Sequence, residues 1–269
     1  MKRGEVVAGS RTALVTGASK GIGREFALQL AQKGYNILMI ASGEAELKVT
    51  AEEVAKLNPQ VWVRHLVKDM ALPHAAEELF AYTEAEGIKV DVLINNAGIF
   101  SFCDILSTPI ERIERMIHLH DITATIMCRL YAADMIERGG GRILNMSSFS
   151  IWMPYPGLSL YSASKAYLKS FSVAFSKEVK DKGVTVTAIC PAGIATDLYG
   201  LSPKLQRFGV KTGILMTPKS CARRALNGMF RGVRCKVPDW WFRLFIPVCQ
   251  LVRGPLMRWL RNFTMQFQK

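Results

Sequence analysis

The stretch Thr16-Gly17-Ala18-Ser19-Lys20-Gly21-Ile22-Gly23 decides the fold of this chain, because of what lies on either side of it. The β-rich run Thr12–Thr16 leads into it, and an amphipathic segment, Ile22–Lys33, follows it. Glycines at such a junction allow a tight turn and let backbone amides approach a phosphate, whose charge the N-terminus of the following helix favours. Glycine turns are common, so the flanking strand and helix carry the prediction of a nucleotide-binding turn.

Strand-like and helix-like segments alternate from this turn as far as residue 190. Strands are predicted at Thr12–Thr16, Asn36–Ala41, Val61–Leu66, Val90–Asn95, Arg142–Ser147 and Val184–Cys190. Helices are predicted at Ile22–Lys33, Glu44–Leu57, His74–Glu86, Pro109–Glu137 and Leu158–Lys182. Several strands are continuous apolar runs, as expected of strands that are covered on both faces. The pattern therefore predicts an α/β fold with a doubly wound parallel sheet in one domain, residues 1–269.

The chain changes character near Gly193. The segment 193–215 is rich in glycine and loop-forming residues, and a helix is predicted from Thr217-Pro218 to about Arg231. A short edge strand is expected at Val233–Val237. The extension 239–269 mixes aromatic residues with arginines and is expected to be helical.

The formal net charge of +13 lies at the C-terminal end of the chain. From Leu201 to Lys269 there are 14 Lys or Arg residues and one acidic residue, Asp239, while the remainder of the chain is balanced. Such an asymmetry indicates one surface that faces a polyanion or a membrane. No nucleic-acid recognition motif accompanies the charge, so nucleic acid is not expected as a partner.

The location is expected to be cytoplasmic. The six cysteines form no CxxC pair or regular framework, which favours free thiols in a reducing compartment. The first ten residues contain no apolar core of a signal peptide, and the most apolar later stretch, Val237–Val252, is interrupted by charged residues and a proline.

The end of the second predicted strand bears on the choice of nucleotide. An acidic residue there would bind the adenosine ribose and repel a 2′-phosphate, but the chain has Ser42. Lys20 in the glycine turn is suited to face that phosphate, although a solvated lysine is the plainer interpretation. The combination favours NADP over NAD.

Polar residues also follow the third and fourth predicted strands. Asp69 comes after the third strand, and Asn95-Asn96-Ala97-Gly98 follows the fourth. Ligands bind at the carboxyl ends of strands in this architecture. Asp69 alone is equally compatible with a helix cap.

A serine, a tyrosine and a lysine mark the chemical end of the predicted site. Ser148 lies at the end of the fifth strand, and Tyr161 and Lys165 are four residues apart at the start of the next helix. They therefore share a helix face, and an ammonium group beside a phenol is expected to lower the pKa of that phenol. Tyr161 then becomes an acid or base for a carbonyl–alcohol pair. Tyrosine–lysine pairs are common on helix surfaces, so the prediction of a catalytic pair depends on the accompanying motifs.

Together these motifs resemble the short-chain dehydrogenase/reductase family, and the resemblance spans residues 12 to about 198. It implies a Rossmann-type sheet of about seven strands, hydride transfer from a nicotinamide cofactor, and usually a homodimer or homotetramer. It also implies that 193–215 is the substrate lid. The catalytic residues that it implies are Ser148, Tyr161, Lys165 and a fourth residue. The cofactor residues are Gly17, Ser19, Lys20, Gly21, Ile22, Gly23, Ser42, Asp69, Asn96, Ala97, Gly98, Tyr161, Lys165, Pro191, Ile194 and Thr196.

The chain departs from the family pattern at this fourth residue, where family members carry an asparagine that holds a water for a proton relay. Matching the run His120-Asp121-Ile122-Thr123-Ala124 to that pattern places Asp121 there, and a one-residue shift places His120 there. Either side chain can hold a water, or both can serve packing alone. His118 and His120 are two residues apart and point to different faces, so no metal site is expected. A second departure is Ala192, where glycine is common.

The basic aromatic extension has two interpretations that the sequence leaves open. It can cover the substrate cleft or a neighbouring subunit, or it can lie on anionic lipid with its apolar side down. An apolar pocket beside basic surface suits a lipid-like ketone, a steroid or a 3-oxoacyl thioester. The leading functional hypothesis is thus an NADP(H)-dependent oxidoreductase that interconverts a ketone and a secondary alcohol. The alternative is a nucleotide-binding regulator or scaffold with impaired catalysis.

Overall fold

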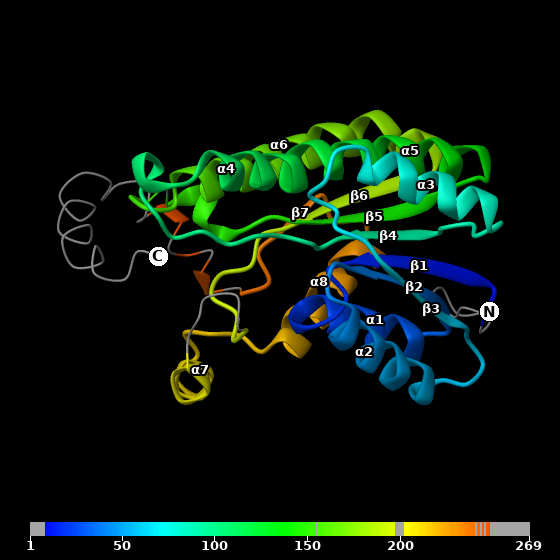
Figure 1. Cartoon of the computed structure of the whole chain (residues 1–269), viewed down its shortest axis with the longest axis horizontal. Coiled ribbons are helices and arrows are strands. Elements are labelled where there is room, and N and C mark those ends of the chain that lie inside the picture. Colours follow the sequence, from blue (N-terminus) through cyan, green and yellow to red (C-terminus); the bar gives the residue numbers. More distant parts are fainter. Residues whose placement is uncertain are drawn as a thin grey trace.

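A single parallel sheet of seven strands organises the described part of the molecule (Figure 1). The computed structural model describes residues 9–153, 155–196, 202–239, 241, 242, 244, 246 and 247. The strands lie in the order β3-β2-β1-β4-β5-β6-β7. They are β1 Arg11–Thr16, β2 Tyr35–Ala41, β3 Val63–Val67, β4 Val92–Asn95, β5 Gly141–Met146, β6 Val184–Ile189 and β7 Cys235–Lys236. This confirms the Rossmann-like α/β fold.

Helices cover both faces of the sheet (Figure 1). On one face lie α1 Gly21–Gln32, α2 Glu44–Leu57 and α8 Pro218–Phe230. On the other lie α3 Ala75–Ala85, α4 Ile110–Ile117, α5 Ala124–Glu137 and α6 Ser159–Val179. No helix of the described residues is both long and apolar enough to cross a membrane.

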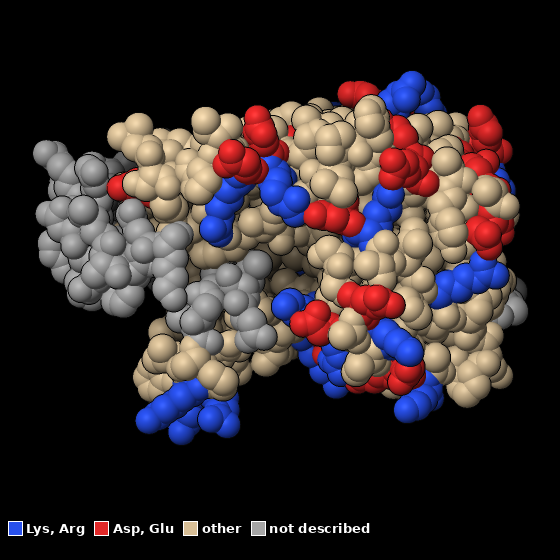
Figure 2. Space-filling view, in the orientation of Figure 1, with Lys and Arg blue, Asp and Glu red and all other residues tan. Residues whose placement is uncertain are grey.

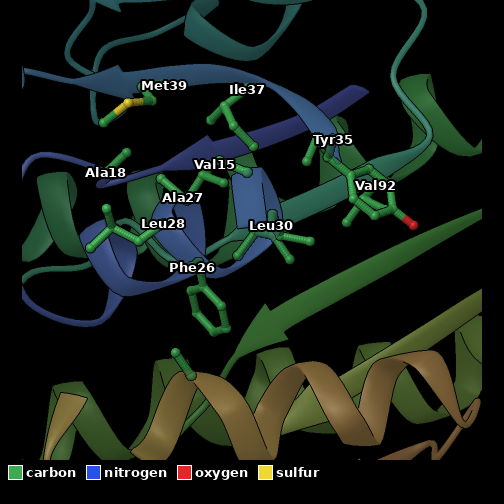
Figure 3. Packing of buried hydrophobic residues seen from close by; sticks show 14 of the residues in the cluster. Val15, Ala18, Phe26, Ala27, Leu28, Leu30, Tyr35, Ile37, Met39 and Val92 are labelled. Atoms are coloured by element: carbon green, nitrogen blue, oxygen red, sulfur yellow. The ribbon is translucent and has the colours of Figure 1, made fainter. Parts of the chain in front are cut away.

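Apolar side chains fill the space between the sheet and each helix layer. The cluster on the α1 side includes Val15, Phe26, Leu30 and Ile37, which are fully buried. Figure 3 shows Phe26 pointing from α1 toward α8. Every residue of β2 is buried, which explains its continuous apolar sequence. The edge strand β3 is mostly exposed instead, and its sequence includes the polar residues Arg64 and His65.

The order of the strands reverses beside β1, which pairs with β2 on one side and β4 on the other. In open α/β sheets, ligands bind at the carboxyl ends of the strands at such a switch point. The glycine turn after β1 and the Asn-Asn-Ala-Gly segment after β4 both lie there. The topology therefore brings two of the predicted motifs to one place.

The helix predicted at Pro109–Glu137 is interrupted. A π-helical turn, His118–Thr123, separates α4 from α5. Such turns are rare and occur often at functional sites. The helix α4 begins without a side-chain cap, and the hydroxyl of the preceding Thr108 donates to the carbonyl of Asp104 at 3.0 Å.

The segment 193–215 contains a helix that was predicted as loop. This helix, α7 Pro203–Lys211, begins after Ser202, whose side chain accepts a hydrogen bond from the amide of Leu205. Residues 197–201 and most of the extension 239–269 lie outside the described residues. The predictions for those parts of the lid and for the extension therefore stay predictions.

Candidate active site

The glycine turn is fastened to the end of β4 by side-chain hydrogen bonds. The Asn96 side-chain amide donates to the carbonyls of Thr16 and Gly17 at 3.0 and 3.2 Å. The Thr16 hydroxyl accepts from the backbone amides of Asn96 and Ala97, both at 3.0 Å. The turn and the Asn-Asn-Ala-Gly segment thus form one hydrogen-bonded unit.

Close packing explains two of the glycines in this unit. Gly17 has a φ of +65°, and a Cβ there would lie 2.9 Å from Ala97 Cα. A Cβ at Gly23 would lie 2.0 Å from the carbonyl oxygen of Gly17. Gly23 therefore allows α1 to approach the turn, while Gly17 provides the left-handed conformation. Both roles match those of a dinucleotide-binding turn.

A cavity of about 730 Å³ runs from the glycine turn to Tyr161. Predicted site residues that line it are Gly17, Ser19, Lys20, Gly21, Ile22, Asn96, Ala97, Gly98, Ser148, Tyr161, Lys165, Pro191, Ile194 and Thr196. The cavity thus joins the phosphate-binding turn to the chemical residues. Its size and glycine-lined end fit a dinucleotide together with a substrate.

Five residues that the sequence analysis considered for the site do not line this cavity: Gly23, Ser42, Asp69, Asp121 and its alternative His120. Asp69 accepts hydrogen bonds from the amide of Ala71 at 2.9 Å and from Arg115 at 2.7 Å. Burial alone would raise the pKa of Asp69, but the bonds from Arg115 and Ala71 hold it below its usual value. Asp69 therefore has protein partners of its own, but it does not cap a helix, because α3 begins only at Ala75.

The reacting residues are held by α6 and β5. The Lys165 ammonium donates to the carbonyl of Met146 at 3.0 Å, and the Ser147 hydroxyl donates to the carbonyl of Lys165 at 2.7 Å. Lys165 Nζ lies 5.8 Å from the centre of the Tyr161 ring. Tyr161 and Lys165 therefore share one helix face beside the cavity, as predicted.

Burial dominates the electrostatics of this pair. It raises the pKa of Tyr161 above its usual value, and the hydrogen bond with Ser148 offsets this only in part. The prediction of a lowered Tyr161 pKa was thus wrong for the protein alone, because desolvation of the phenolate outweighs its neighbours. Burial also lowers the pKa of Lys165 to about 8, and the negative charge of Asp121 acts in the opposite direction.

His120 occupies the space between the Asn-Asn-Ala-Gly segment and α6. Its Nε2 accepts from the amide of Ile99 at 3.0 Å, and its Nδ1 lies 2.9 Å from the hydroxyl of Ser164. The proton therefore resides on Nδ1 and is donated to Ser164. The pKa of His120 lies well below its usual value because the ring is buried and because Lys165 is nearby, so His120 is neutral.

Asp121 has different surroundings from His120. Its Oδ1 is buried without a hydrogen-bond partner among the described residues. Burial raises the pKa of Asp121 to about 6, and the charge of Lys165 lowers it. A Cβ at Gly98 would lie 3.1 Å from His120 Nε2 and 3.4 Å from Lys165 Nζ. His120 and Asp121 thus both lie near Lys165, and which of them takes the place of the fourth residue stays a prediction.

The loop after β6 closes the other side of the cavity. Ile194 pairs with Met216 in an isolated bridge, and the amide of Ala195 donates to the carbonyl of Met216 at 2.9 Å. A Cβ at Gly21 would lie 3.4 Å from the methyl group of Thr196. Thr196 thus lies next to Gly21 of the glycine turn, and its contact with the cofactor stays a prediction.

Aromatic side chains that were not predicted lie at and near the far end of the site. Phe100 meets Tyr161 edge to face, with ring centres 5.1 Å apart, and lines the cavity. Phe149 packs against Trp152 and Phe242 at 5.4 and 5.3 Å. Phe100 and Phe149 follow the ends of β4 and β5 by five and three residues, which was a signal for them, but loop aromatics alone do not reveal where they point.

The chain belongs to the short-chain dehydrogenases. The family model described as short chain dehydrogenase matches residues 11–204, and these residues contain the turn, the serine, the tyrosine and the lysine. The protein is therefore an oxidoreductase of the class that acts on alcohols and carbonyl groups, as predicted.

The names of curated relatives describe reductases and dehydrogenases of lipid-like substrates. A very-long-chain 3-oxoacyl-CoA reductase of Pyrenophora tritici-repentis is 35% identical over 180 residues, which cover 66% of this chain and 53% of that protein. The 17-beta-hydroxysteroid dehydrogenase type 3 of Mus musculus is 33% identical over 191 residues, covering 69% and 61%. The chain thus spans between about half and two thirds of the length of these relatives.

A solved relative carries a bound nucleotide. The short-chain dehydrogenase from Sphingobium yanoikuyae in complex with NADPH is 27% identical, with a TM-score of 0.77 and coverage of 90% of this chain and 94% of that one. A 7beta-hydroxysteroid dehydrogenase structure, at 24% identity and a TM-score of 0.80, shares the fold.

Proposed function

We propose that this protein is an NADPH-dependent reductase that converts an apolar ketone into a secondary alcohol. The observation that carries the proposal is that one cavity joins the glycine turn to Ser148, Tyr161 and Lys165. The substrates that fit best are a steroid, a 3-oxoacyl thioester or another lipid-like ketone.

The residues around the cavity can take on the separate tasks of a carbonyl reduction. When bound, NADPH supplies the hydride. The Ser148 hydroxyl donates a hydrogen bond to the substrate oxygen, and the Tyr161 hydroxyl gives its proton to that oxygen. The Lys165 ammonium stabilises the phenolate that remains, since a positive charge favours the ionised tyrosine.

The preference for NADPH rests on two residues at the adenosine end. Lys20 is exposed and lines the cavity, and β2 is followed by Ser42, which carries no charge to repel a 2′-phosphate. The comparison of kcat/KM with NADPH and NADH tests this assignment. We expect a higher value with NADPH, and a preference for NADH would overturn it.

The apolar substrate class rests on the aromatic end of the site. Phe100 lies against Tyr161, where the carbonyl must sit, and Ile99 beside it adds to the apolar wall of the cavity. The names of the curated relatives point to the same chemistry. A panel of steroid, 3-oxoacyl-CoA and short-chain ketones tests it through NADPH oxidation. Turnover of small polar sugars alone would contradict it.

The alternative function is a nucleotide-bound regulator or scaffold. Its supporting observation is that neither Asp121 nor His120 is the asparagine of the family pattern, and that both ring nitrogens of His120 have partners within the protein. The wild-type protein and Tyr161→Phe separate the two functions. If neither reduces a carbonyl in the panel while both bind NADPH, the regulator gains support.

We further propose that the protein is a homodimer or homotetramer. Its support is a set of exposed apolar residues on the outer side of α4, the π-helical turn and α6, namely Ile110, Ile117, Ile122 and Tyr167. Burial of such residues stabilises association. Light scattering after gel filtration measures the mass, and a monomer at assay concentrations would contradict the proposal.

A further inference from the structure

The helix α7 stands away from the body of the molecule beside the cavity (Figure 1). Its Gly209 is buried, and a Cβ there would lie 2.6 Å from Leu215, so this side of the helix packs inward. Gln206 on the same helix lines the cavity. The opposite side of α7 therefore faces outward at the entrance side of the site.

Two large apolar side chains lie on one flank of α7, next to its buried side. Leu205 and Phe208 are 55% and 62% exposed, and their spacing of three residues places them side by side on the helix. Ile214, just beyond the helix, is 55% exposed as well. Isolated apolar residues are common on surfaces, but three of them on one short protruding segment form a patch.

A row of basic side chains borders the apolar pair. Lys204, Arg207 and Lys211 are all exposed and follow the helical spacing of three and four residues. The sequence from Ser202 to Pro238 contains no acidic residue. Figure 2 shows the blue side chains gathered at the outer end of α7 with no red ones beside them.

We infer that α7 docks this protein on an anionic phospholipid surface. The basic row meets the headgroups, while Leu205 and Phe208 enter the boundary between headgroups and acyl chains. Stable attachment of a protein to a membrane takes both an apolar and an electrostatic contribution, and α7 carries both. A soluble polyanion satisfies only the basic row and leaves the Phe208 ring in water. The pairing of the two therefore favours the lipid surface.

The docking places the cavity next to the membrane, because Gln206 belongs to both α7 and the cavity wall. An apolar ketone dissolved in the bilayer then has a short path to Tyr161. This consequence rests on the proposed function, whereas the docking itself does not.

Co-sedimentation of the full chain with vesicles tests the inference. The vesicles are phosphatidylcholine alone and phosphatidylcholine with phosphatidylglycerol. We expect binding to the second kind only, weakened by salt, and a loss of about tenfold in partition for Leu205→Ser combined with Phe208→Ser. A matched control is Val49→Ser on α2, which also removes an exposed apolar side chain.

The basic row has a control of its own. Lys204→Gln with Lys211→Gln is expected to reduce binding to the anionic vesicles, whereas Lys48→Gln with Lys56→Gln on α2 is not. NADPH affinity, measured by fluorescence, checks that each variant is folded.

Three outcomes would overturn the inference. One is equal sedimentation of wild type and the α7 variants, which assigns any lipid binding to another part of the chain. The second is no binding to either vesicle. The third is an oligomer in gel filtration that the α7 substitutions convert to a smaller species, because the patch would then bind a second copy of the chain. None of them depends on ketone turnover, so they are distinct from a failure of the proposed function.

Discussion

Phe26 on α1 and Phe208 on α7 are the same side chain in opposite surroundings. Phe26 is fully buried between α1 and α8 (Figure 3), and Phe208 is 62% exposed. Around Phe26 the turn, the strand ends and the helix are joined by hydrogen bonds and close glycine contacts. Around Phe208 a short helix rests on Leu215. The cofactor region is thus built for fixed geometry, and the α7 region presents a surface to something outside the chain.

The largest effect is expected at the chemical end of the fixed region. Tyr161→Phe removes the hydroxyl that donates the proton, so kcat for ketone reduction should fall by about 10²- to 10⁴-fold. NADPH affinity should change little. Tyr155→Phe is a matched control, since Tyr155 is also a buried aromatic of this region. A similar loss of kcat in both variants would mean that the effect is structural.

The comparison between the two phenylalanines is itself testable. Phe26→Ala should lower the free energy of unfolding by about 3–5 kcal/mol, because it leaves a cavity in the core. Phe208→Ala should change it by no more than about 0.5 kcal/mol, because the side chain is largely in water already. Urea unfolding measures both. A large loss for Phe208→Ala would show that α7 is packed more firmly than its exposure indicates.

Much of the fixed region was predictable from the sequence, because its motifs lie at strand ends that the topology brings together. Each of these motifs belongs to a short segment at the end of a strand or the start of a helix, as Thr16, Asn96 and Tyr161 do. The segment α7 was predicted as loop, although Ser202-Pro203 is the same kind of helix start as Thr217-Pro218. The glycines Gly209 and Gly213 obscured that signal, because glycine usually ends helices.

The electrostatics of the site could not be predicted from spacing alone. The distance in sequence from Tyr161 to Lys165 says that they share a face, but not that both are buried. Burial raises the pKa of Tyr161, which spacing does not reveal. The π-helical turn could not be predicted from spacing either, and neither could the contacts of His120 with Ile99 and Ser164.

Substitution of Gly17 in the glycine turn is expected to have an effect of intermediate size on stability and NADPH binding, and Gly87 provides a matched control. Gly17 and Gly87 have φ values of +65° and +64°, but an added methyl group is crowded only at Gly17. Both alanine variants carry backbone strain of about 1 kcal/mol. Gly17→Ala should lose a further ~1–3 kcal/mol of stability and weaken NADPH binding about tenfold or more. Isothermal titration checks the affinity, and equal behaviour of the two variants would contradict the packing role of Gly17.

The smallest effect concerns pH and Asp121. The pKa of Asp121 is about 6 in the folded protein, compared with the usual 3.8. Between pH 3.8 and about 6, the folded protein therefore keeps a proton on Asp121 that the unfolded chain has already released. Stability therefore falls as the pH rises through this window, and the buried carboxylate is a cost at neutral pH. Asp121→Asn should gain about 1 kcal/mol there, a value reduced for its partial exposure.

The same substitution should move the pH profile of the reaction. The Asp121 charge raises the pKa of Lys165, which is about 8, so its removal should shift the alkaline limb of kcat to lower pH. Asp239→Asn is the matched control, because burial also raises the pKa of Asp239 but its neighbouring charge is Arg224. A shift of the limb in both variants, or in neither, would contradict the assignment.

The central claim is that one cavity brings NADPH and an apolar ketone together beside Tyr161. Reduction of a bulky ketone with NADPH that carries deuterium at the transferable position of the nicotinamide tests it most directly. Mass spectrometry of the product should show one deuterium on the new carbinol carbon. Bound NADPH with no alcohol formed, or an alcohol without deuterium, would contradict the claim.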